Sequence, residues 1–222
     1  MPALLALERA MSDLWSARAA AYRESDAHRE GPDLDLIVEW SAQATTALDV
    51  ATGGGHVARV LREAGLRVVT SDPAPGMQAD VVCRAEELPF ADASFDIVVS
   101  RLGAHHFAEI RTAARELARV AADRVIIVDN LYGGGALEEA ERVRDPSHVR
   151  CLPEEEWRSF FGESGLVVAD VRLFTTRIEL EPWLERAECV GEAAERVREL
   201  ADERIEDGWI TLERIALRGA RS

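Results

Sequence analysis

The chain has 222 residues, of which 47% are hydrophobic and 30% are charged, a composition that suits one globular domain over residues 1–222. Twenty-six basic against 41 acidic residues give a formal net charge of −15, which disfavours nucleic acid as a substrate because polyanions are repelled. No apolar run approaches the ~20 residues of a membrane span, and the first residues do not resemble a signal peptide. We therefore expect a cytoplasmic protein without a membrane partner.

The three cysteines, Cys83, Cys151 and Cys189, are widely spaced and form no CxxC pair. This pattern fits neither a disulfide framework nor a zinc site, so we predict reduced cysteines that serve in packing and no bound metal. The sequence does not define the oligomeric state, and a homodimer remains open.

The first 44 residues are predicted to form a helical cap. Leu4, Leu7 and Met11 recur at three- and four-residue spacing, which is typical of a helix with one apolar face. A second helix is predicted over residues 34–44. This segment is either a packing arm or a lid over a cofactor, and the sequence alone does not separate the two.

Residues 45–129 alternate short apolar segments with amphipathic ones. Near-continuous apolar strands between helices indicate a parallel sheet covered on both faces, and hence an α/β fold. The predicted strands are 47–51, 66–70, 79–83, 95–100 and 124–129, and the predicted helices are 57–64 and 108–121.

The last 93 residues differ in pattern from the preceding ones. Residues 130–164 are predicted to be an insertion on the substrate side, and residues 130–153, which contain three consecutive glycines, are expected to include a mobile or irregular stretch. Residues 165–222 are predicted to form a strand–helix–strand unit. Its expected elements, together with the helix that precedes it, are a helix at 154–164, strands at 166–178 and 209–217, and a long helix at 182–205.

A glycine-rich turn lies between the first predicted strand and the helix that follows it. Gly53, Gly54 and Gly55 there would let a ligand approach the backbone without meeting a Cβ atom, although a tight strand–helix turn explains such a loop equally well. Asp72 ends the second predicted strand nineteen positions after Gly53, close to the ~20-residue offset of a ribose-binding carboxylate. Together, the loop and this acid favour a ligand that contains adenosine.

The glycine spacing favours S-adenosylmethionine (SAM) over a nicotinamide dinucleotide. Ala58 and Arg59 stand where a dinucleotide fingerprint would have its last glycine, which allows close packing around a pyrophosphate. SAM has no phosphate, and its sulfonium and ammonium groups favour a nearby carboxylate. Asp49, on the first predicted strand, is placed to supply one. A nicotinamide-dependent oxidoreductase is therefore disfavoured.

Several ordered motifs between about residues 20 and 170 resemble those of class I SAM-dependent methyltransferases, in particular the type-11 group, which includes ubiquinone- and menaquinone-biosynthesis enzymes and other small-molecule methyltransferases. Residues 48–56 resemble motif I of the class, and residues 85–90 with 94–98 resemble a block of the type-11 group. Residues 101–107 and 144–150 resemble a narrower subgroup.

The resemblance implies a Rossmann-like, seven-stranded sheet in the order 3-2-1-4-5-7-6, with an antiparallel last strand and helices on both faces. It implies SAM as cofactor, S-adenosylhomocysteine as product and a small-molecule acceptor. Asp49 and the glycines would hold the methionine part, Asp72 the ribose, and Ala85 with Glu86 the adenine. The implied cofactor-binding residues are Tyr22, Asp49, Ala51, Thr52, Gly53, Gly55, Ser71, Asp72, Pro73, Met77, Ala85, Glu86 and Arg101.

One position departs from the pattern of the resembled group. Arg84 stands where members commonly have an aspartate that accepts from the adenine amino group, and arginine cannot accept a hydrogen bond. We therefore expect adenine recognition to rest on the backbone of Ala85 and Glu86.

Histidines follow the fourth predicted strand, at the edge where open α/β sheets bind ligands. His105 and His106 are the candidate catalytic residues, with His105 expected to contact substrate and His106 to orient it; both could instead hold the loop backbone. His148 and Arg144 are candidate substrate residues in a polar lid, or members of a solvated loop. A non-catalytic SAM-binding or protein-interaction module stays open as the alternative function.

Overall fold

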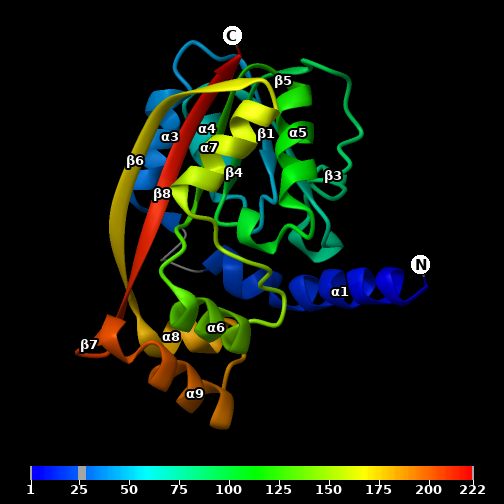
Figure 1. Cartoon of the computed structure of the whole chain (residues 1–222). Coiled ribbons are helices and arrows are strands. Elements are labelled where there is room, and N and C mark those ends of the chain that lie inside the picture. The colour runs from blue at the N-terminus through cyan, green and yellow to red at the C-terminus, as the bar shows by residue number, and fades with distance from the viewer. Residues whose placement is uncertain (1, 25–28, 222) are drawn as a thin grey trace.

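An eight-stranded mixed sheet forms the centre of the computed structural model, which describes residues 2–24 and 29–221 (Figure 1). Its order is β3-β2-β1-β4-β5-β8-β6, with β7 beside β8; β1 to β5 are parallel, and β8 runs antiparallel to β5 and β6. The predicted order is confirmed, with β8 as the seventh strand and the two-residue β7 as an addition. The strands are β1 (Thr46–Val50), β2 (Arg67–Asp72), β3 (Val81–Val82), β4 (Phe95–Arg101), β5 (Ala121–Asn130), β6 (Leu166–Glu179), β7 (Ile205–Glu206) and β8 (Trp209–Arg221).

Helices cover both faces of this sheet, because successive strand residues point to opposite sides. Ile97 and Val99 of β4 face a core that includes α3 and α4, whereas Val98 between them faces α5 and α7. These side chains are fully buried, and burying each contributes about 1.5–3 kcal/mol. The helices are α1 (Pro2–Glu24), α3 (Pro32–Trp40), α4 (His56–Glu63), α5 (Ile110–Val120), α6 (Gly135–Arg144), α7 (Glu154–Glu163), α8 (Leu180–Arg186) and α9 (Glu192–Leu200), with 3-10 turns at η1 (Pro75–Met77), η2 (Ala104–His106) and η3 (Asp202–Arg204).

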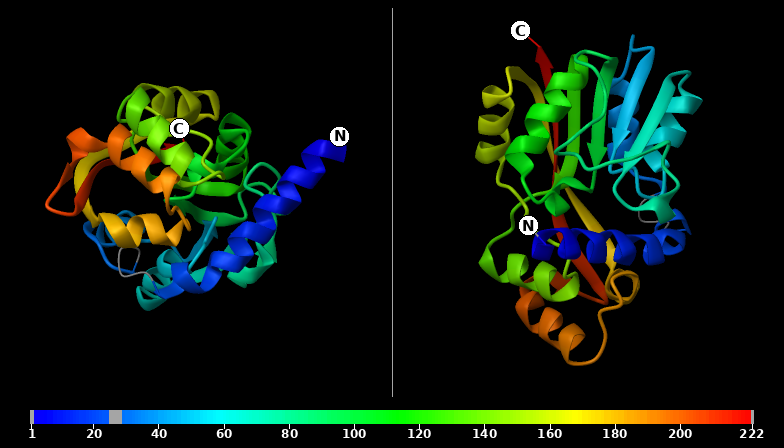
Figure 2. Two further views of the ribbon diagram at one scale, coloured as in Figure 1. Left: turned by 90° about the horizontal axis from the view of Figure 1, so that it is seen from below. Right: turned by 90° about the vertical axis from the view of Figure 1, so that its right-hand side faces the viewer.

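A second, smaller core lies beyond the carboxyl edge of the parallel strands. It joins α6, α8 and α9 to the far ends of β6 and β8 through residues such as Leu137, Trp183, Val197 and Leu212. Figures 1 and 2 show α1 crossing between this lobe and the edge of the sheet. The molecule thus places three layers around that edge: the sheet, α1 and the lobe.

One expectation about this lobe is wrong, and one helix in it was not predicted. Residues 130–153, expected to include an irregular stretch, are irregular on both sides of α6, which forms because Leu137 and Ala140 give the helix a buried face against α9 despite the adjacent glycines. The long helix expected over 182–205 is two helices. They separate before Gly191, whose φ of +60° a continuous α-helix does not accommodate.

The other predicted elements are present with shifted ends. The strand expected at 79–83 is reduced to Val81–Val82, and the helix expected at 34–44 begins at Pro32 and ends at Trp40. Within the described ranges, 2–24 and 29–221, no helix combines the length and apolar character that crossing a membrane requires.

Candidate active site

The loop after β1 turns sharply before α4 begins. Ala51, Gly53 and Gly55 all have positive φ, of 56°, 51° and 77°, and the amide of Thr52 donates to the carbonyl of Ser71 on β2 at 3.1 Å. A non-glycine residue in this conformation is strained, and such strain is concentrated at ligand-binding loops. The loop therefore exposes a curved stretch of backbone beside the ends of β1 and β2.

Asp72, at the end of β2, is fixed directly against this loop. Its Oδ2 accepts from the amide of Gly53 at 3.0 Å, and its Oδ1 accepts from the amide of Ala74 at 2.9 Å. The side chain is buried, and this burial raises the pKa of the carboxyl. The structure thus brings together the two features, the glycine loop and the acid, that the sequence placed nineteen positions apart.

Asp49 on β1 is almost completely buried and only half satisfied. Its Oδ2 accepts from Thr52 Oγ1 at 2.6 Å and from the amide of Ala58 at 3.1 Å, whereas its Oδ1 is buried without a hydrogen-bond partner. Burial raises the pKa of this carboxyl to about 7. Leaving a buried acceptor without a hydrogen bond costs about 1–3 kcal/mol of folding free energy. A ligand that supplied a hydrogen-bond donor or a cation to Oδ1 would therefore remove this cost.

The end of α1 covers this region. Its residues Ala19, Trp15 and Tyr22 pack against Ala74 and Met77, in and beside η1. Burial raises the pKa of the Tyr22 phenol. Hydrogen bonds tie the same helix to the loops: Ser12 Oγ donates to the carbonyl of Pro73 at 2.9 Å, and His56 Nε2 lies 3.0 Å from the carbonyl of Tyr22.

Ala85 and Glu86 lie in the loop after β3. Ala85 is buried, and the carboxylate of Glu86 accepts hydrogen bonds from two donors. Glu86 Oε1 accepts from the amide of Glu109 at 3.1 Å, and Oε2 accepts from Arg84 Nε at 3.3 Å. Burial would raise the pKa of Glu86, but these hydrogen bonds lower it overall. Arg84 therefore orients Glu86 in the structure.

Arg101 ends β4, and its side chain is engaged in a buried ion pair. Its Nε lies 2.5 Å from Asp33 Oδ2 on α3, and Nη1 of Arg214 on β8 lies 3.8 Å from the same oxygen. Sequence patterns do not single out Asp33, because an acid in the first turn of a helix ordinarily interacts favourably with the helix dipole.

His105 and Asp129 form a buried pair where β4 and β5 end. The carboxylate of Asp129 lies 2.5 Å from His105 Nδ1 and also accepts from the amides of His105 and Asn130, both at 2.8 Å. Because a carboxylate can only accept, Nδ1 carries the proton and Nε2 is left as an acceptor. Burial lowers the pKa of His105, but Asp129 raises it to a net value above the ordinary one.

His106 has a different environment, although its ring lies 4.1 Å from that of His105. Its Nδ1 lies 3.0 Å from the carbonyl of Ser147, and its ring lies edge-on to Trp15 at 4.7 Å. Burial and the neighbouring His105 hold its pKa well below the ordinary value. His106 is therefore neutral at neutral pH and is held between the loop and α1.

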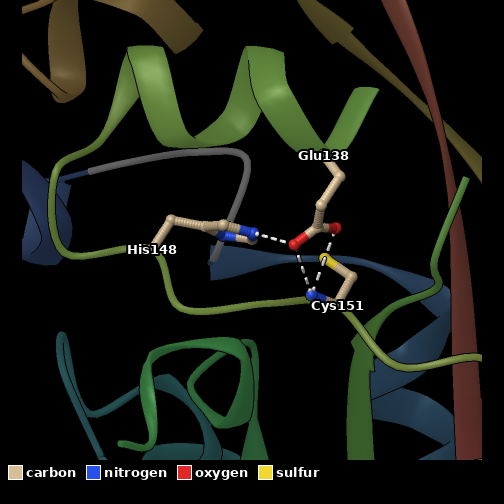
Figure 3. A group of neighbouring side chains, drawn as sticks. All are labelled: Glu138, His148 and Cys151. Atoms are coloured by element: carbon tan, nitrogen blue, oxygen red, sulfur yellow. Dashed lines mark hydrogen bonds and ion pairs between the residues drawn. The ribbon is translucent and has the colours of Figure 1, made fainter. Parts of the chain in front are cut away.

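His148 is buried in a cluster with Glu138 and Cys151 (Figure 3). Its Nε2 lies 2.9 Å from Glu138 Oε1, which also accepts from the amide of Cys151 at 3.2 Å and lies 3.3 Å from Arg142 Nη2. One possible ligand atom from each of these three side chains lies within 4.8 Å of the other two. Histidine, cysteine and glutamate are residue types that bind transition metals. Hydrogen bonds already occupy the Glu138 carboxylate, whereas His148 Nδ1 is buried without a hydrogen-bond partner in the described part of the chain.

Arg144 is likewise buried rather than solvated. Its Nε donates to Glu141 Oε2 at 3.0 Å, and its guanidinium carbon lies 4.4 Å from the centre of the Trp183 ring on α8. The alternative of a solvated loop for His148 and Arg144 is therefore wrong. The sequence missed Asp129, Glu138 and Glu141, which nothing in the local pattern distinguished from ordinary acidic residues.

Several proteins similar to this chain are named as methyltransferases. Residues 48–128 match the model of a methyltransferase domain family. YcgJ of Bacillus subtilis, named an uncharacterized methyltransferase, is 30% identical over 211 residues, which cover 84% of this chain and 82% of YcgJ. The malonyl-[acyl-carrier protein] O-methyltransferase of Serratia marcescens is 29% identical over 161 residues, which cover 65% of this chain and 63% of that protein.

Solved structures agree with this assignment. The structure of YcgJ superposes with a TM-score of 0.76 at 24% identity over 85% of this chain and 97% of that one. The methyltransferase structure BH2331 of Bacillus halodurans gives a TM-score of 0.73 at 26% identity over 86% of this chain and 99% of its own. Fold, site and relatives together show that the chain belongs to the class I SAM-dependent methyltransferases.

Proposed function

We propose that this chain transfers the methyl group of SAM to a small-molecule acceptor, using His105 as the general base. The observation that carries the proposal is the position of the buried, half-satisfied Asp49 and the loop-bound Asp72 at the same sheet edge as the His105–Asp129 pair. The similarity to a demethylmenaquinone methyltransferase of Thermus thermophilus, 36% identical over 114 residues, supports a small-molecule acceptor.

The residues at this edge fit SAM chemically. Each oxygen of Asp72 receives one backbone amide, and a carboxylate oxygen can accept a second donor, so two ribose hydroxyls can be bound as well. The unpaired Oδ1 of Asp49 fits the ammonium group of the methionine part. The loop backbone at Ala51, Thr52, Gly53 and Gly55 would line the methionine part, and Tyr22, Ser71, Pro73, Met77, Ala85, Glu86 and Arg101 would surround the remainder.

When bound, SAM supplies an electrophilic methyl group on a sulfonium. The protein aligns the acceptor with that methyl, and orientation of this kind contributes about 7–11 kcal/mol to lowering a barrier. His105 Nε2 accepts the proton that a hydroxyl or amine acceptor must lose, and the Asp129 carboxylate stabilises the resulting imidazolium. General-base catalysis of this type contributes roughly 10²–10⁴-fold in rate. His106 and His148 would shape the acceptor side, with Arg144 behind them.

Titration calorimetry with SAM and S-adenosylhomocysteine tests the proposal. Asp72→Ala removes the proposed ribose acceptor, and because hydrogen bonds to charged groups contribute about 1.5–3 kcal/mol, we expect affinity to fall at least about tenfold. Asp35→Ala, at an exposed aspartate of α3, is the matched control and should bind normally. Absence of binding by the wild type would overturn the proposal, and equal affinity of Asp72→Ala would overturn the ribose assignment.

Turnover separates the proposed enzyme from a non-catalytic module of the same fold. Wild-type protein with a broad panel of hydroxyl and amine acceptors should release S-adenosylhomocysteine. His105→Gln should slow that release by the factor expected of a general base while leaving cofactor affinity intact. Cofactor binding without turnover on any acceptor would favour the module.

A further inference from the structure

Arginines gather around the proposed acceptor side, although the chain as a whole carries a net charge of −15. Two of them have carboxylate partners of their own. Arg18 Nη1 lies 3.3 Å from Asp145 Oδ1, and Arg144 Nε lies 3.0 Å from Glu141 Oε2. All four of these side chains are buried, and each pair balances its own charge. These arginines serve the packing of α1 and α6.

Two further arginines share one carboxylate. Arg101 holds Asp33 at 2.5 Å, so that Arg214, at 3.8 Å from the same oxygen, has only the weaker contact. The Nε of Arg214 is buried without a hydrogen-bond partner. Burial lowers the pKa of Arg214 to about 10. Register places Arg214 on β8 opposite Asn130 on β5, next to the Asp129 that holds the proposed base.

Arg186 ends α8 and has no acidic partner in the part of the chain that the structure describes. Among the residues that the structure describes, no carboxylate or carbonyl lies within hydrogen-bond or ion-pair distance of its guanidinium, which is half-buried. Neighbouring contacts fix its position: Arg144 stacks on Trp183 one turn earlier in α8, and Arg18 donates to the carbonyl of Ala187 at 2.7 Å. Arg186 therefore lies where α1, α6 and α8 meet.

The pKa shifts of these cations agree with their positions. Burial lowers the pKa of Arg186; the nearby Tyr22 opposes this shift, and the proximity of Arg144 adds to it. Arg186 in turn lowers the pKa of Arg214. Among the described residues, four of these five arginines contact four carboxylates: Arg18 contacts Asp145 and, at 3.6 Å, Glu188; Arg144 contacts Glu141; and Arg101 and Arg214 share Asp33. In the described part of the chain Arg186 therefore has no carboxylate partner and Arg214 has only a shared one, in a partly dry region where an unpaired charge is costly.

We infer that Arg186 and Arg214 bind an anionic group, a carboxylate or a phosphate, of the methyl acceptor. This inference rests on the proposed function and adds the substrate class to it. Planar guanidiniums are suited to such oxyanions because they donate two parallel hydrogen bonds. An acceptor held by its anionic end at α8 and β8 would present its other end to His105. The carboxylate of the cofactor is the other possible source of the anion, and the experiment separates the two.

The test uses protein saturated with S-adenosylhomocysteine and titrated with two anionic probes, 4-hydroxybenzoate and inorganic phosphate. Methyl 4-hydroxybenzoate is the neutral counterpart of the first probe. We expect the wild type to bind at least one anion in preference to the neutral ester. Arg186→Gln should weaken that binding about tenfold to a hundredfold, and Arg186→Lys should restore part of it. Arg158→Gln, an exposed arginine on α7, is the matched control.

The unfolding temperature provides the second readout. Because Arg186 is surrounded by like charges, Arg186→Gln should leave that temperature unchanged or raise it, whereas loss of a merely structural residue would lower it. Equal binding of ester and acid, no anion binding by the wild type, or unaltered binding by Arg186→Gln would each overturn the inference. Weaker binding of S-adenosylhomocysteine by Arg186→Gln would instead assign the anion to the cofactor. Failure of the wild type to bind S-adenosylhomocysteine at all would refute the proposed function itself.

Discussion

Replacing Asp129 with asparagine should reverse the proton arrangement of His105. The carboxylate accepts three N–H groups: the ring Nδ1 and amide of His105 and the amide of Asn130. Asparagine keeps one acceptor oxygen and places an NH₂ donor where the other oxygen stood. Whichever way the amide is turned, at least one N–H group faces a donor, which costs about 1–3 kcal/mol. With the amide nitrogen at the Oδ1 position, moving the ring proton to Nε2 turns the clash at His105 Nδ1 into a hydrogen bond, and the base is then lost.

The pH dependence of this variant has a defined sign. Asp129 raises the pKa of His105 above its ordinary value of 6.5, so the pair stabilises the fold fully below pH 6.5. This contribution is lost as pH rises from 6.5 through the folded-state pKa. In Asp129→Asn, the His105 pKa should fall below 6.5, because burial, its largest cause, is then opposed chiefly by Glu141 alone, and the contribution to stability at low pH should disappear.

Two measurements check this prediction without an identified acceptor. Nitrogen-15 NMR of the imidazole should show a proton on Nδ1 of His105 in the neutral wild type and on Nε2 in Asp129→Asn. Chemical denaturation at several pH values should show the stability loss of about 1–3 kcal/mol. Asp123→Asn, an exposed position on the same strand, is the control. An unchanged His105 tautomer and pKa in Asp129→Asn would refute the reasoning.

Two other substitutions test the cofactor side. Because the pKa of Asp49 is raised to about 7, the ionised fraction of its carboxyl increases as pH passes 7, and the affinity for S-adenosylhomocysteine should rise over that range. Calorimetry of Asp49→Asn should show an affinity that does not depend on pH there, and a persistent pH dependence would contradict the assignment. A Cβ atom on Gly54 would lie 2.7 Å from the carbonyl oxygen of Tyr22, so Gly54→Ala should lower the free energy of unfolding by about 1–3 kcal/mol. Gly135→Ala should not, because, its own helix backbone and chain neighbours aside, no atom of the described residues lies within 4 Å of the position of its Cβ. Equal unfolding temperatures of the two variants would argue against this packing.

Local patterns were sufficient to predict the parts of the site that one strand–turn–helix unit builds. The glycine loop, Asp49 and Asp72 lie on two adjacent strands, so their spacing in the chain fixes their proximity in the sheet. The order of the strands came from the resemblance to a family, since periodicity identifies strands and does not order them. Helix α6 was missed because the glycines before it indicate a loop more strongly than its short buried face indicates a helix.

The partners of the site residues could not be predicted, because they depend on which elements meet in three dimensions. In the sequence, Asp129 is an ordinary acidic residue at the end of a strand. The pairing of β4 with β5 brings it into contact with His105. Arg186 looked like a basic residue in the last turn of a helix, where it would suit the dipole. Only its position between α1 and α6 shows that it is half-buried, with no acid beside it among residues 2–24 and 29–221.

A crystal structure of the complex with S-adenosylhomocysteine tests the central claim most directly. The account predicts ribose hydroxyls on Asp72, the amino group at Oδ1 of Asp49, and the sulfur facing the side of the edge where His105 Nε2 and Arg186 lie. A product molecule bound away from the loop after β1, or one whose sulfur points away from His105, would contradict it.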